Sequence, residues 1–473
     1  MKNTSCNESS PGKTNILKMY KHYHLIGIGG IGMSGIAQLL LRRGIKVSGS
    51  DLKESRITQE LKKLGAQIFI GHDPVNIKDA DIIIYSSAIR QDNPEMQEAQ
   101  RQGMPLLKRA EALARLMQDE TIVTVTGSHG KTTTASLASY LLLEAGFSPT
   151  IAVGGFLKNI DTNAYLGDGR FFVAEADESD GSFLYYRPKY SIITNIDYEH
   201  LDYYKEFKNA IATFKRFLNN TDQNGCVFVC SDDINLKNII KDYKNRYVLF
   251  GLRDDAHIYP KNIEMKGLSC EFDCFYKNKF IDRFHLALGG EHNISNALSV
   301  IALGFELGLN LKVIKNTLTN YKGARRRLEI KFSDKDLLLI DDYAHHPTEI
   351  RATLSALRNL KFNRLIAIFQ PHRYTRTKLL LDEFGRSFDL VDYTIITDIY
   401  PAGEPPLEGI NGRLLYDKIK EQTPYKQVIF LPKEEIVKHI LETIKPHNLV
   451  VTLGAGDIVK ICDELVEELR RKS

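Results

Sequence analysis

Hydrophobic and polar positions follow one rhythm that repeats in three blocks along the chain. Each block opens with a short β-branched run, passes through a glycine-rich or polar turn, and continues with a helical period. In the first block, HLIGIG leads into the helical stretch GMSGIAQLLLRRG, and the runs KVSGSD and DIIIYSSAI follow. Strands that alternate with helices in this way predict a mostly parallel sheet.

The second block begins after MPLLKRAEALARLMQDE, which we interpret as a connecting helix. The strand TIVTVT is followed by the loop GSHG and by the helical stretch KTTTASLASYLLLEAG, which ends at Gly146. The apolar runs FFVAEA and SIITNID continue the pattern. Residues 225–288 then change to short alternating strands, and GGEHNISNALSVIALGFELG predicts a loop and a helix.

The third block opens near Arg325 and has the doubly wound α/β pattern, with DLLLIDDYA, LIAIFQP, YTIITDIY, QVIFLP and NLVVTLGAG as its apolar runs. At roughly 100–200 residues per domain, a length of 473 residues also favours three domains. We therefore predict an α/β protein of three domains behind a short polar tail. The expected ranges are 1–20 for the tail, 21–118 for an N-terminal Rossmann-like domain, 119–325 for a central P-loop ATPase-like domain with a mostly parallel sheet, and 326–473 for a C-terminal Rossmann-like domain.

Charge and hydropathy narrow the function classes. The chain has 63 Lys and Arg against 59 Asp and Glu, so no overall field favours nucleic acid or an anionic membrane as a partner. The polar N-terminus lacks the apolar core of a signal peptide, and no segment approaches the roughly 18 apolar residues that span a bilayer. We expect a cytoplasmic protein that is a monomer or a weak homodimer.

The cysteines do not suggest a structural role. Six cysteines are too few for a disulfide framework in a chain of this length, and they fit a reducing compartment. Cys226 with Cys230 and Cys270 with Cys274 form two C-x-x-x-C pairs. This is not a standard zinc spacing, and both pairs lie in alternating, strand-like sequence, so we expect no metal site there.

The first candidate site is the glycine turn GIGGIG at residues 27–32. Its spacing matches the dinucleotide fingerprint, and Asp51 closes the next strand, where a ribose-binding acid would stand. Alone, this pattern predicts a nicotinamide or flavin enzyme. Such a turn, however, only brings backbone N–H groups to a pyrophosphate at a helix N-terminus. A UDP-sugar would satisfy it as well as NAD, and a tight turn without a ligand also remains open.

The second candidate site is the loop GSHGKT at residues 127–132. It resembles a phosphate-binding loop, but Val125 stands where the first glycine of the usual pattern belongs. A β-branched strand precedes the loop and a helix follows it. Backbone amides would hold the phosphates, Lys131 would reach the β- and γ-phosphates, and the hydroxyl of Thr132 or Thr133 would bind Mg²⁺. The missing glycine removes none of these groups, so we predict a nucleotide site.

Further polar clusters follow the apolar strands. Carboxylates beside a phosphate loop are where a magnesium nucleotide needs ligands, and we favour Glu175 and His200 as ligands over a solvated acidic loop. In open α/β sheets, ligands bind beyond the carboxyl ends of the strands. The clusters are Glu175, Asp177, Glu178 and Asp180 after FFVA, Glu199, His200 and Asp202 after SIITNID, and the runs 325–327, 341–347 and 371–376 in the last block.

Taken together, these motifs resemble the Mur ligases of bacterial cell-wall synthesis over nearly the whole chain from about His24. The resemblance rests on GIGGIGMSG, TGSHGKTTT, EADESDGSF, the TNID-to-His200 stretch, GEHNISNA, RRRLE, DDYAHHPTEI, FQPHRYTRT, DIYPAGE and LGAGDI. Within the family, the sequence is most similar to the branch that joins L-alanine to the carboxylate of UDP-N-acetylmuramate for peptidoglycan. The resemblance implies that ATP converts this carboxylate to an acyl phosphate, that the amine of L-alanine attacks it, and that ADP and phosphate leave.

The resemblance also implies roles for matched positions. The glycine turn would hold the UDP end of the sugar nucleotide, the central loop would bind ATP with two Mg²⁺ ions that Mn²⁺ can replace, and the last domain would contribute to ATP and to the amino acid. We expect no carbamylated lysine. The sugar-nucleotide residues would be Gly29, Gly30, Ile31, Gly32, Asp51 and Ser86. The ATP residues would be Gly127, Ser128, His129, Gly130, Lys131, Thr132, Thr133, His292, Asn293 and Asn296, the last three at adenine, with Arg327 and Asp342. The metal ligands would be Thr132, Glu175 and His200. The residues that bind the amino acid would be Tyr343, His345, His346, Arg373 and Arg376. The catalytic residues would be Lys131, His200, His345, His346 and Arg376.

Two departures and three alternatives remain. Ala344 replaces a glycine and Leu328 a phenylalanine of the commoner family text, and neither change removes a charge. A recycling ligase that attaches a tripeptide to the same sugar nucleotide would be expected to lack the HRYTR pattern. A nicotinamide-dependent oxidoreductase leaves the GKTTT loop unexplained, and a non-enzymatic P-loop switch protein leaves the DDYAHHP and HRYTR clusters without a role.

Overall fold

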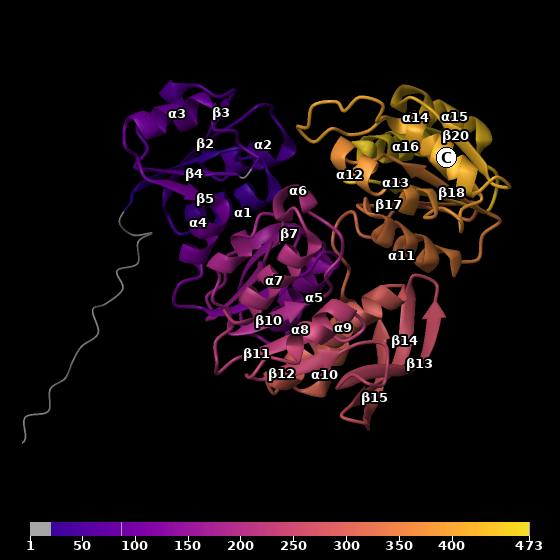
Figure 1. Ribbon diagram of the computed structural model, residues 1–473, viewed down its shortest axis with the longest axis horizontal. Helices are drawn as coiled ribbons and strands as arrows, with labels where there is room; N and C mark the ends of the chain where they lie inside the picture. The colour runs from indigo at the N-terminus through magenta and orange to yellow at the C-terminus, as the bar shows by residue number, and fades with distance from the viewer. Residues whose placement is uncertain (1–19, 87, 473) are drawn as a thin grey trace, which may run out of the picture.

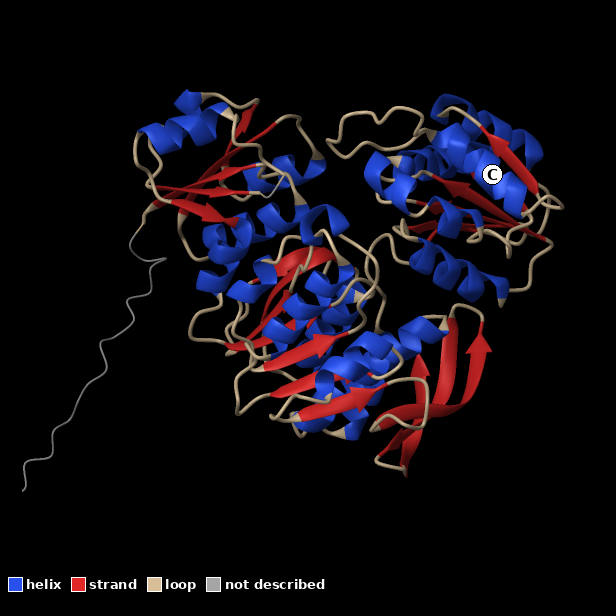
Figure 2. Ribbon diagram, viewed as in Figure 1, coloured by secondary structure: helices blue, strands red, loops and turns tan. Residues whose placement is uncertain are grey.

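The computed structural model describes residues 20–86 and 88–472, apart from the side chains of residues 201, 202 and 472. The predicted tail therefore lies, except for Tyr20, outside the described residues. The strands form three separate sheets with helices packed against them, which confirms the predicted three-domain α/β fold (Figures 1 and 2). No helix in the described part of the chain is long and apolar enough to cross a membrane.

The first sheet has five parallel strands in the order β3-β2-β1-β4-β5. The strands β1 and β4 are mostly buried, and α1 begins at Ile31, within the glycine-rich segment of residues 27–32 that follows β1. Its elements are β1 (His22–Ile26), α1 (Ile31–Arg42), β2 (Lys46–Asp51), α2 (Arg56–Lys63), β3 (Gln67–Ile70), the 3-10 helix η2 (Pro74–Ile77), β4 (Ile82–Tyr85), α3 (Pro94–Arg101), β5 (Leu106–Lys108) and α4 (Arg109–Leu116).

The connecting helix that we expected before the second block is only partly correct. Leu106–Lys108 forms β5 and pairs in parallel with β4, and the helix α4 begins at Arg109. A strand of three residues is too short to show alternation, so only its pairing with β4 reveals it.

The second sheet has ten strands in the order β15-β14-β13-β12-β11-β10-β6-β9-β7-β8. It is parallel from β13 to β7, while β14, β15 and β8 are antiparallel to their neighbours. Its first elements are β6 (Thr121–Thr126), α5 (Lys131–Glu144), β7 (Thr150–Leu157), β8 (Thr162–Tyr165), β9 (Phe171–Glu175), the 3-10 helix η3 (Ser182–Tyr185), β10 (Tyr190–Ile193), α6 (Leu201–Tyr204) and α7 (Phe207–Leu218). Its remaining elements are β11 (Cys226–Cys230), α8 (Ile234–Ile240), β12 (Tyr247–Phe250), β13 (Ile258–Lys266), β14 (Ser269–Tyr276), β15 (Lys279–Leu286), α9 (Glu291–Glu306) and α10 (Leu311–Asn320). The helix α8 lies within residues 225–288, where we expected strands alone.

The third sheet has six strands in the order β16-β17-β21-β18-β19-β20, and only β16 is antiparallel to its neighbour. Its elements are β16 (Glu329–Ser333), β17 (Leu337–Asp342), α11 (Pro347–Arg358), β18 (Arg364–Phe369), α12 (Tyr374–Leu379), α13 (Leu381–Gly385), β19 (Tyr393–Ile396), α14 (Gly412–Gln422), β20 (Gln427–Phe430), α15 (Lys433–Thr443), β21 (Asn448–Leu453) and α16 (Ile458–Lys472).

The first two sheets share one hydrophobic core, while the third has its own. One cluster of buried residues extends from Tyr23 to Tyr321 across both sheets, and a small separate cluster around Ile26 and Met96 lies within the first domain. The residues on either face of the third sheet form two others. Contact between the first two domains comes largely from α1, which packs on β7 and β8 (Figure 1). The amide of Asn163 donates to the carbonyl of Ile31 at 2.8 Å, and Gln38 donates to Asn163 at 3.2 Å.

Candidate active site

The phosphate loop joins β6 to α5, and two of its positions require glycine. Gly127 has φ +129°, and an added Cβ would lie 2.2 Å from the hydroxyl oxygen of Thr194. Gly130 precedes α5 with φ +81°, and its Cβ would lie 2.8 Å from Oδ1 of Asn296. The loop therefore packs directly against the neighbouring strand and against α9, with the N-terminus of α5 left for a ligand.

Lys131 is held at the base of this loop. Its Nζ donates to the carbonyls of Gly127 at 2.6 Å and Ser128 at 3.1 Å, and to Oε1 of Glu178 at 2.9 Å. Burial opposes the charged form, but the carboxylates of Glu178, Asp177 and Glu175 raise the pKa of Lys131 above its ordinary value. The side chain is thus a partly buried cation.

Two groups of possible cation ligands flank Lys131. The hydroxyl of Thr132 donates to Glu175 at 3.0 Å, and the backbone N–H of Gly154 also donates to this carboxylate at 2.8 Å. His200, with φ +56°, lies with Glu178 and Glu199, at 3.6 Å and 3.7 Å from their carboxylate oxygens. These three residues can direct one ligand atom each to a common point, and Glu175 is not part of that group.

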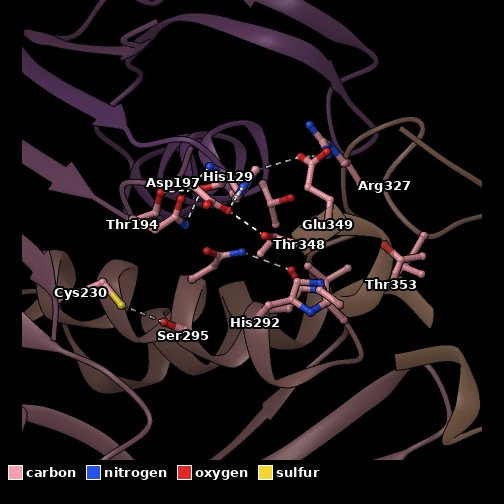
Figure 3. A pocket seen from close by; sticks show the side chains of 18 of the residues that line it. His129, Thr194, Asp197, Cys230, His292, Ser295, Arg327, Thr348, Glu349 and Thr353 are labelled. Carbon is pink, nitrogen blue, oxygen red and sulfur yellow. Dashed lines mark hydrogen bonds and ion pairs between the residues drawn. The ribbon is translucent and has the colours of Figure 1, made fainter. Parts of the chain in front are cut away.

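A pocket of about 400 Å³ opens beside the loop, between the second and third domains (Figure 3). This is the size of an ordinary small-molecule site. It is lined by the loop, by the strand ends after β10 and β17, and by the first turns of α9 and α11. Of the residues predicted to bind ATP, His129, Gly130, Thr133, His292, Asn293, Asn296, Arg327 and Asp342 line it, while Gly127, Ser128, Lys131 and Thr132 do not.

The far end of the pocket is built by α9. Burial, together with the nearby Arg327, lowers the pKa of His292 to about 4, so its imidazole is neutral. The side-chain amide of Asn293 donates to the carbonyl of Gly289 at 2.8 Å, and that of Asn296 donates to Asn293 at 3.4 Å. Neutral amides and an imidazole provide donors and acceptors that suit a heterocyclic base.

Contacts between the second and third domains line the pocket, and the sequence analysis did not predict them. Asp197 accepts hydrogen bonds from His129 at 2.9 Å and from the hydroxyl of Thr348 on α11 at 2.7 Å (Figure 3). Glu349 lies 3.6 Å from both His129 and Arg327. Burial disfavours the charged imidazole, but Asp197 and Glu349 raise the pKa of His129 to about 10. Both acids stand within the TNID and HHPTEI motifs, which was the one available signal.

A second polar cluster lies at the carboxyl end of the third sheet. His345 lies 3.2 Å from Glu349, its ring centroid is 5.5 Å from that of His372, and Arg376 contacts His372 at 3.0 Å and Glu199 at 3.3 Å. Burial lowers the pKa of His345 to about 4 and, with neighbouring cations, that of His372 to about 2. Both imidazoles are therefore neutral. His372 lies in the PHRYTR run quoted above, but we did not predict a role for it.

The other residues predicted for the amino acid are placed differently. His346 accepts the backbone N–H of Thr348 at 3.3 Å and lies with its ring 4.7 Å from that of His129, so its contacts are with the phosphate loop. Arg373 pairs with Glu404 at 3.7 Å, and the ring of Tyr343 lies 5.4 Å from that of His345.

The first domain presents its own glycine turn. Gly27 has φ +79°, the backbone N–H of Gly29 donates to Asp51 at 2.9 Å, and Gly30 is the residue before α1. An added Cβ at Gly32 would lie 2.9 Å from the guanidinium of Arg109, which pairs with Asp177 of the acidic loop at 3.2 Å. Ile31 is partly exposed at the helix start, and the hydroxyl of Ser86 lies just after β4, where it accepts the N–H of Ala88 at 3.3 Å. Arg109, which we did not predict, thus links the glycine turn to the acidic loop.

Comparison with known proteins bears on this arrangement. Residues 22–121 match the Mur ligase family, catalytic domain, residues 125–304 match the Mur ligase middle domain, and residues 326–456 match the Mur ligase, glutamate ligase domain. The UDP-N-acetylmuramate--L-alanine ligase of Geotalea uraniireducens is 43% identical over 94% of this chain and 98% of its own length.

The chain belongs to the Mur ligase family. Among solved structures, this Mur ligase is similar to the UDP-N-acetylmuramate-alanine ligase of Thermotoga maritima, with a TM-score of 0.83 and 30% identity over 96% of this chain and all of the other. A murein peptide ligase of Psychrobacter arcticus shares the fold, with a TM-score of 0.70 and 23% identity over 95% of this chain and 98% of the other.

Proposed function

We propose that this Mur ligase joins L-alanine to the carboxylate of UDP-N-acetylmuramate, with ATP hydrolysed to ADP and phosphate, as a step in peptidoglycan precursor synthesis. The observation that carries the proposal is a partly buried lysine cation on a phosphate loop beside a pocket, with a separate glycine turn on the first domain. The relative and the solved structure named for this same reaction support it.

ATP would lie in the pocket with its base against α9. The backbone N–H groups at the start of α5 would bind the phosphates, and Lys131 would exchange its bonds to loop carbonyls for bonds to phosphate oxygens. Arg327 reaches the pocket from the linker to the third domain and would contact the γ-phosphate, with Asp342 near the ribose.

The residues around the loop fit Mg²⁺. Glu178 has a buried Oε2 with no hydrogen-bond partner in the described structure, and carboxylate and hydroxyl oxygens are the ligands that Mg²⁺ prefers. Thr132 and Glu175 would hold one ion, and His200 with Glu178 would hold a second. Bound Mg²⁺ would neutralise charge on the phosphate oxygens. The His200 nitrogen would also accept Mn²⁺.

The remaining residues would orient the two acceptors. A carboxylate is a poor acyl donor, so one muramyl carboxylate oxygen must first bond to the γ-phosphorus while the bond to ADP breaks. The alanine nitrogen then bonds to the acyl carbon, the bond from that carbon to the phosphate oxygen breaks, and the nitrogen gives up a proton as phosphate leaves. Arg376 would pair with the alanine carboxylate, and the neutral His345 would accept a hydrogen bond from the amine.

The alternatives are less well supported. The relatives named above and their coverage favour the alanine ligase over the tripeptide ligase, and the neighbour of that class shares the fold at 23% identity. An oxidoreductase would use only the first glycine turn. A cytoplasmic location and a monomeric or weakly dimeric state remain predictions.

Phosphate release from ATP and Mg²⁺ tests the proposal when UDP-N-acetylmuramate and L-alanine are omitted in turn. Release that requires both acceptors supports the ligase. Phosphate release that does not depend on the sugar nucleotide contradicts the proposal. A change in the nicotinamide absorbance after NADH is added would favour the oxidoreductase. Replacing L-alanine by the tripeptide separates the two ligase branches.

A further inference from the structure

A chain of buried polar side chains crosses the first domain, away from the pocket. It contains the side chains His22, Ser48, His24, Glu95, Ser50 and His72, drawn from β1, β2, α3 and the loop after β3. His24 and Glu95 are completely buried. Buried ionisable groups are costly unless every proton has a partner, so such a chain needs an explanation beyond packing.

The hydrogen bonds determine which atoms carry the protons at the His72 end of this row of side chains. Ser50 donates its single hydroxyl proton to Oε2 of Glu95 at 2.5 Å. The same hydroxyl oxygen lies 3.0 Å from Nδ1 of His72, and it can only accept there. The proton must therefore be on Nδ1 of His72, which also lies 3.4 Å from Glu95. In the neutral ring, Nε2 is then a hydrogen-bond acceptor.

The same reasoning applies at the His22 end of this row of side chains. Nδ1 of His22 lies 2.7 Å from the carbonyl of Asp79, so it carries the proton, and Nε2 of His22 accepts from Ser48 at 2.9 Å. Ser48 then accepts from Nδ1 of His24 at 2.9 Å. Nε2 of His24 lies 3.5 Å from Glu95 and has no hydrogen-bond partner in the described structure. None of these hydrogen bonds requires a proton on Nε2 of His72.

Glu95 also fixes the backbone that carries His72. Its Oε1 accepts from the side chain of Asn76 at 2.6 Å and from the N–H of Asp73 at 3.4 Å. Burial alone would raise the pKa of Glu95, but the nearby His24 and hydrogen bonds from Ser50 and Asn76 lower it below its ordinary value. The ionised carboxylate thus holds both the imidazole and its loop.

Backbone hydrogen bonds place His72 and its hydrogen-bonded neighbours close to the glycine turn. The N–H groups of Gly27 and Ile28 donate to the carbonyl of Ser50, and the N–H of Gly71 donates to the carbonyl of Asp51 at 2.8 Å. If the turn takes a diphosphate and Asp51 a ribose, the base must lie beyond Asp51 at the end of β3. Exposed Leu52 and Ile70 offer apolar contacts for a planar ring at this edge.

We propose that Nε2 of His72 selects a pyrimidine with a protonated N3, as in uracil, by accepting the N3–H hydrogen bond. Ser50 and Glu95 are positioning residues that hold the ring in this tautomer. Cytosine has a lone pair at N3 and would oppose the lone pair of Nε2. The inference rests on the proposed function, because it assumes that the turn binds a nucleoside diphosphate.

Titration calorimetry of the full-length protein with UDP and with CDP tests the inference. We expect UDP to bind wild type about tenfold more tightly than CDP, as one hydrogen bond allows, and His72→Ala to reduce this ratio to about twofold or less. His22→Ala is the matched control, because it alters the same chain at the amino end of β1 and should keep the ratio.

The outcomes separate the two proposals. Wild type that binds neither UDP nor UDP-N-acetylmuramate contradicts the proposed function. Wild type that prefers UDP, with the same preference in His72→Ala, overturns only the role of His72. If that variant does not fold, nitrogen NMR of wild type with labelled histidine decides: the inference requires one unprotonated Nε2 that responds to UDP and not to CDP.

Discussion

Lys131 is a partly buried cation that pairs with Glu178 and also donates to a carbonyl of the phosphate loop. We expect Lys131→Ala to lower kcat by about 10²–10³, the size of one preorganised contact to developing charge. Steady-state phosphate release measures it, and Lys237→Ala is a control because Lys237 pairs with the exposed Asp255 on the same domain. Near-normal turnover in the Lys131 variant would contradict the phosphate assignment.

Arg376 tests the amino-acid end of the site. Its guanidinium lies between His372 and Glu199, and a carboxylate arriving there would gain a charge-assisted hydrogen bond. We expect Arg376→Ala to raise KM for L-alanine about tenfold or more while KM for ATP changes little. Initial rates measured at varied L-alanine concentration and at varied ATP concentration give the two KM values. A change confined to KM for ATP would place this arginine at the nucleotide instead.

The role of some site residues can be predicted from the sequence, while the role of others cannot. Lys131, His292 and Asn296 stand in motifs whose spacing fixes their role, and all three lie at the loop or its pocket. Glu349 and Arg109 act through partners 220 and 68 positions away, at His129 and Asp177. No local pattern marks such partners, because only the packing of separate elements brings them together.

At the scale of elements, α5 shows how a helix start differs from a helix end. Gly130 and Gly146 flank this helix with φ of +81° and +77°, but an added Cβ meets Asn296 at Gly130 and nothing within 4 Å at Gly146. Both alanine variants pay the backbone cost of the left-handed region, about 1–2 kcal/mol of unfolding free energy. The steric conflict is confined to the first.

We therefore expect Gly130→Ala to weaken ATP binding at least tenfold, and Gly146→Ala to leave it unchanged at a similar loss of stability. Calorimetric titration with ATP, beside thermal melting of both variants, separates the two effects. Equal ATP affinity in the two variants would show that the close approach of the loop to α9 is unimportant for binding.

Elements with long β-branched runs were predicted well, and short or interrupted ones were not. The strands β6, β10, β17 and β18 coincide with obvious apolar runs. The strand β5 has three residues and the helix α8 has seven, and both take their form from their neighbours. The strands β14 and β15 form local antiparallel hairpins, and they join the parallel sheet only through β13, which pairs with β12 at Phe250 and Ile258.

At the scale of the whole molecule, His129 joins the second domain to the third through Asp197 and Glu349. Its pKa of about 10 exceeds the ordinary 6.5, so the stability gained from the protonated ring is complete below about pH 6.5 and is lost as pH rises toward 10. We expect the melting temperature of wild type to fall more between pH 7 and 9.5 than that of His129→Gln. Parallel falls in both proteins would contradict this coupling.

The single core shared by the first two sheets has a thermal consequence. Residues that bury one another lose their packing together, so these two domains should melt as one cooperative unit. The third domain has separate cores and is joined to the rest mainly by polar contacts, which a bound nucleotide would reinforce. Scanning calorimetry should then resolve two transitions without ligand that draw together when ATP is added, although the chain is divided into three sheets.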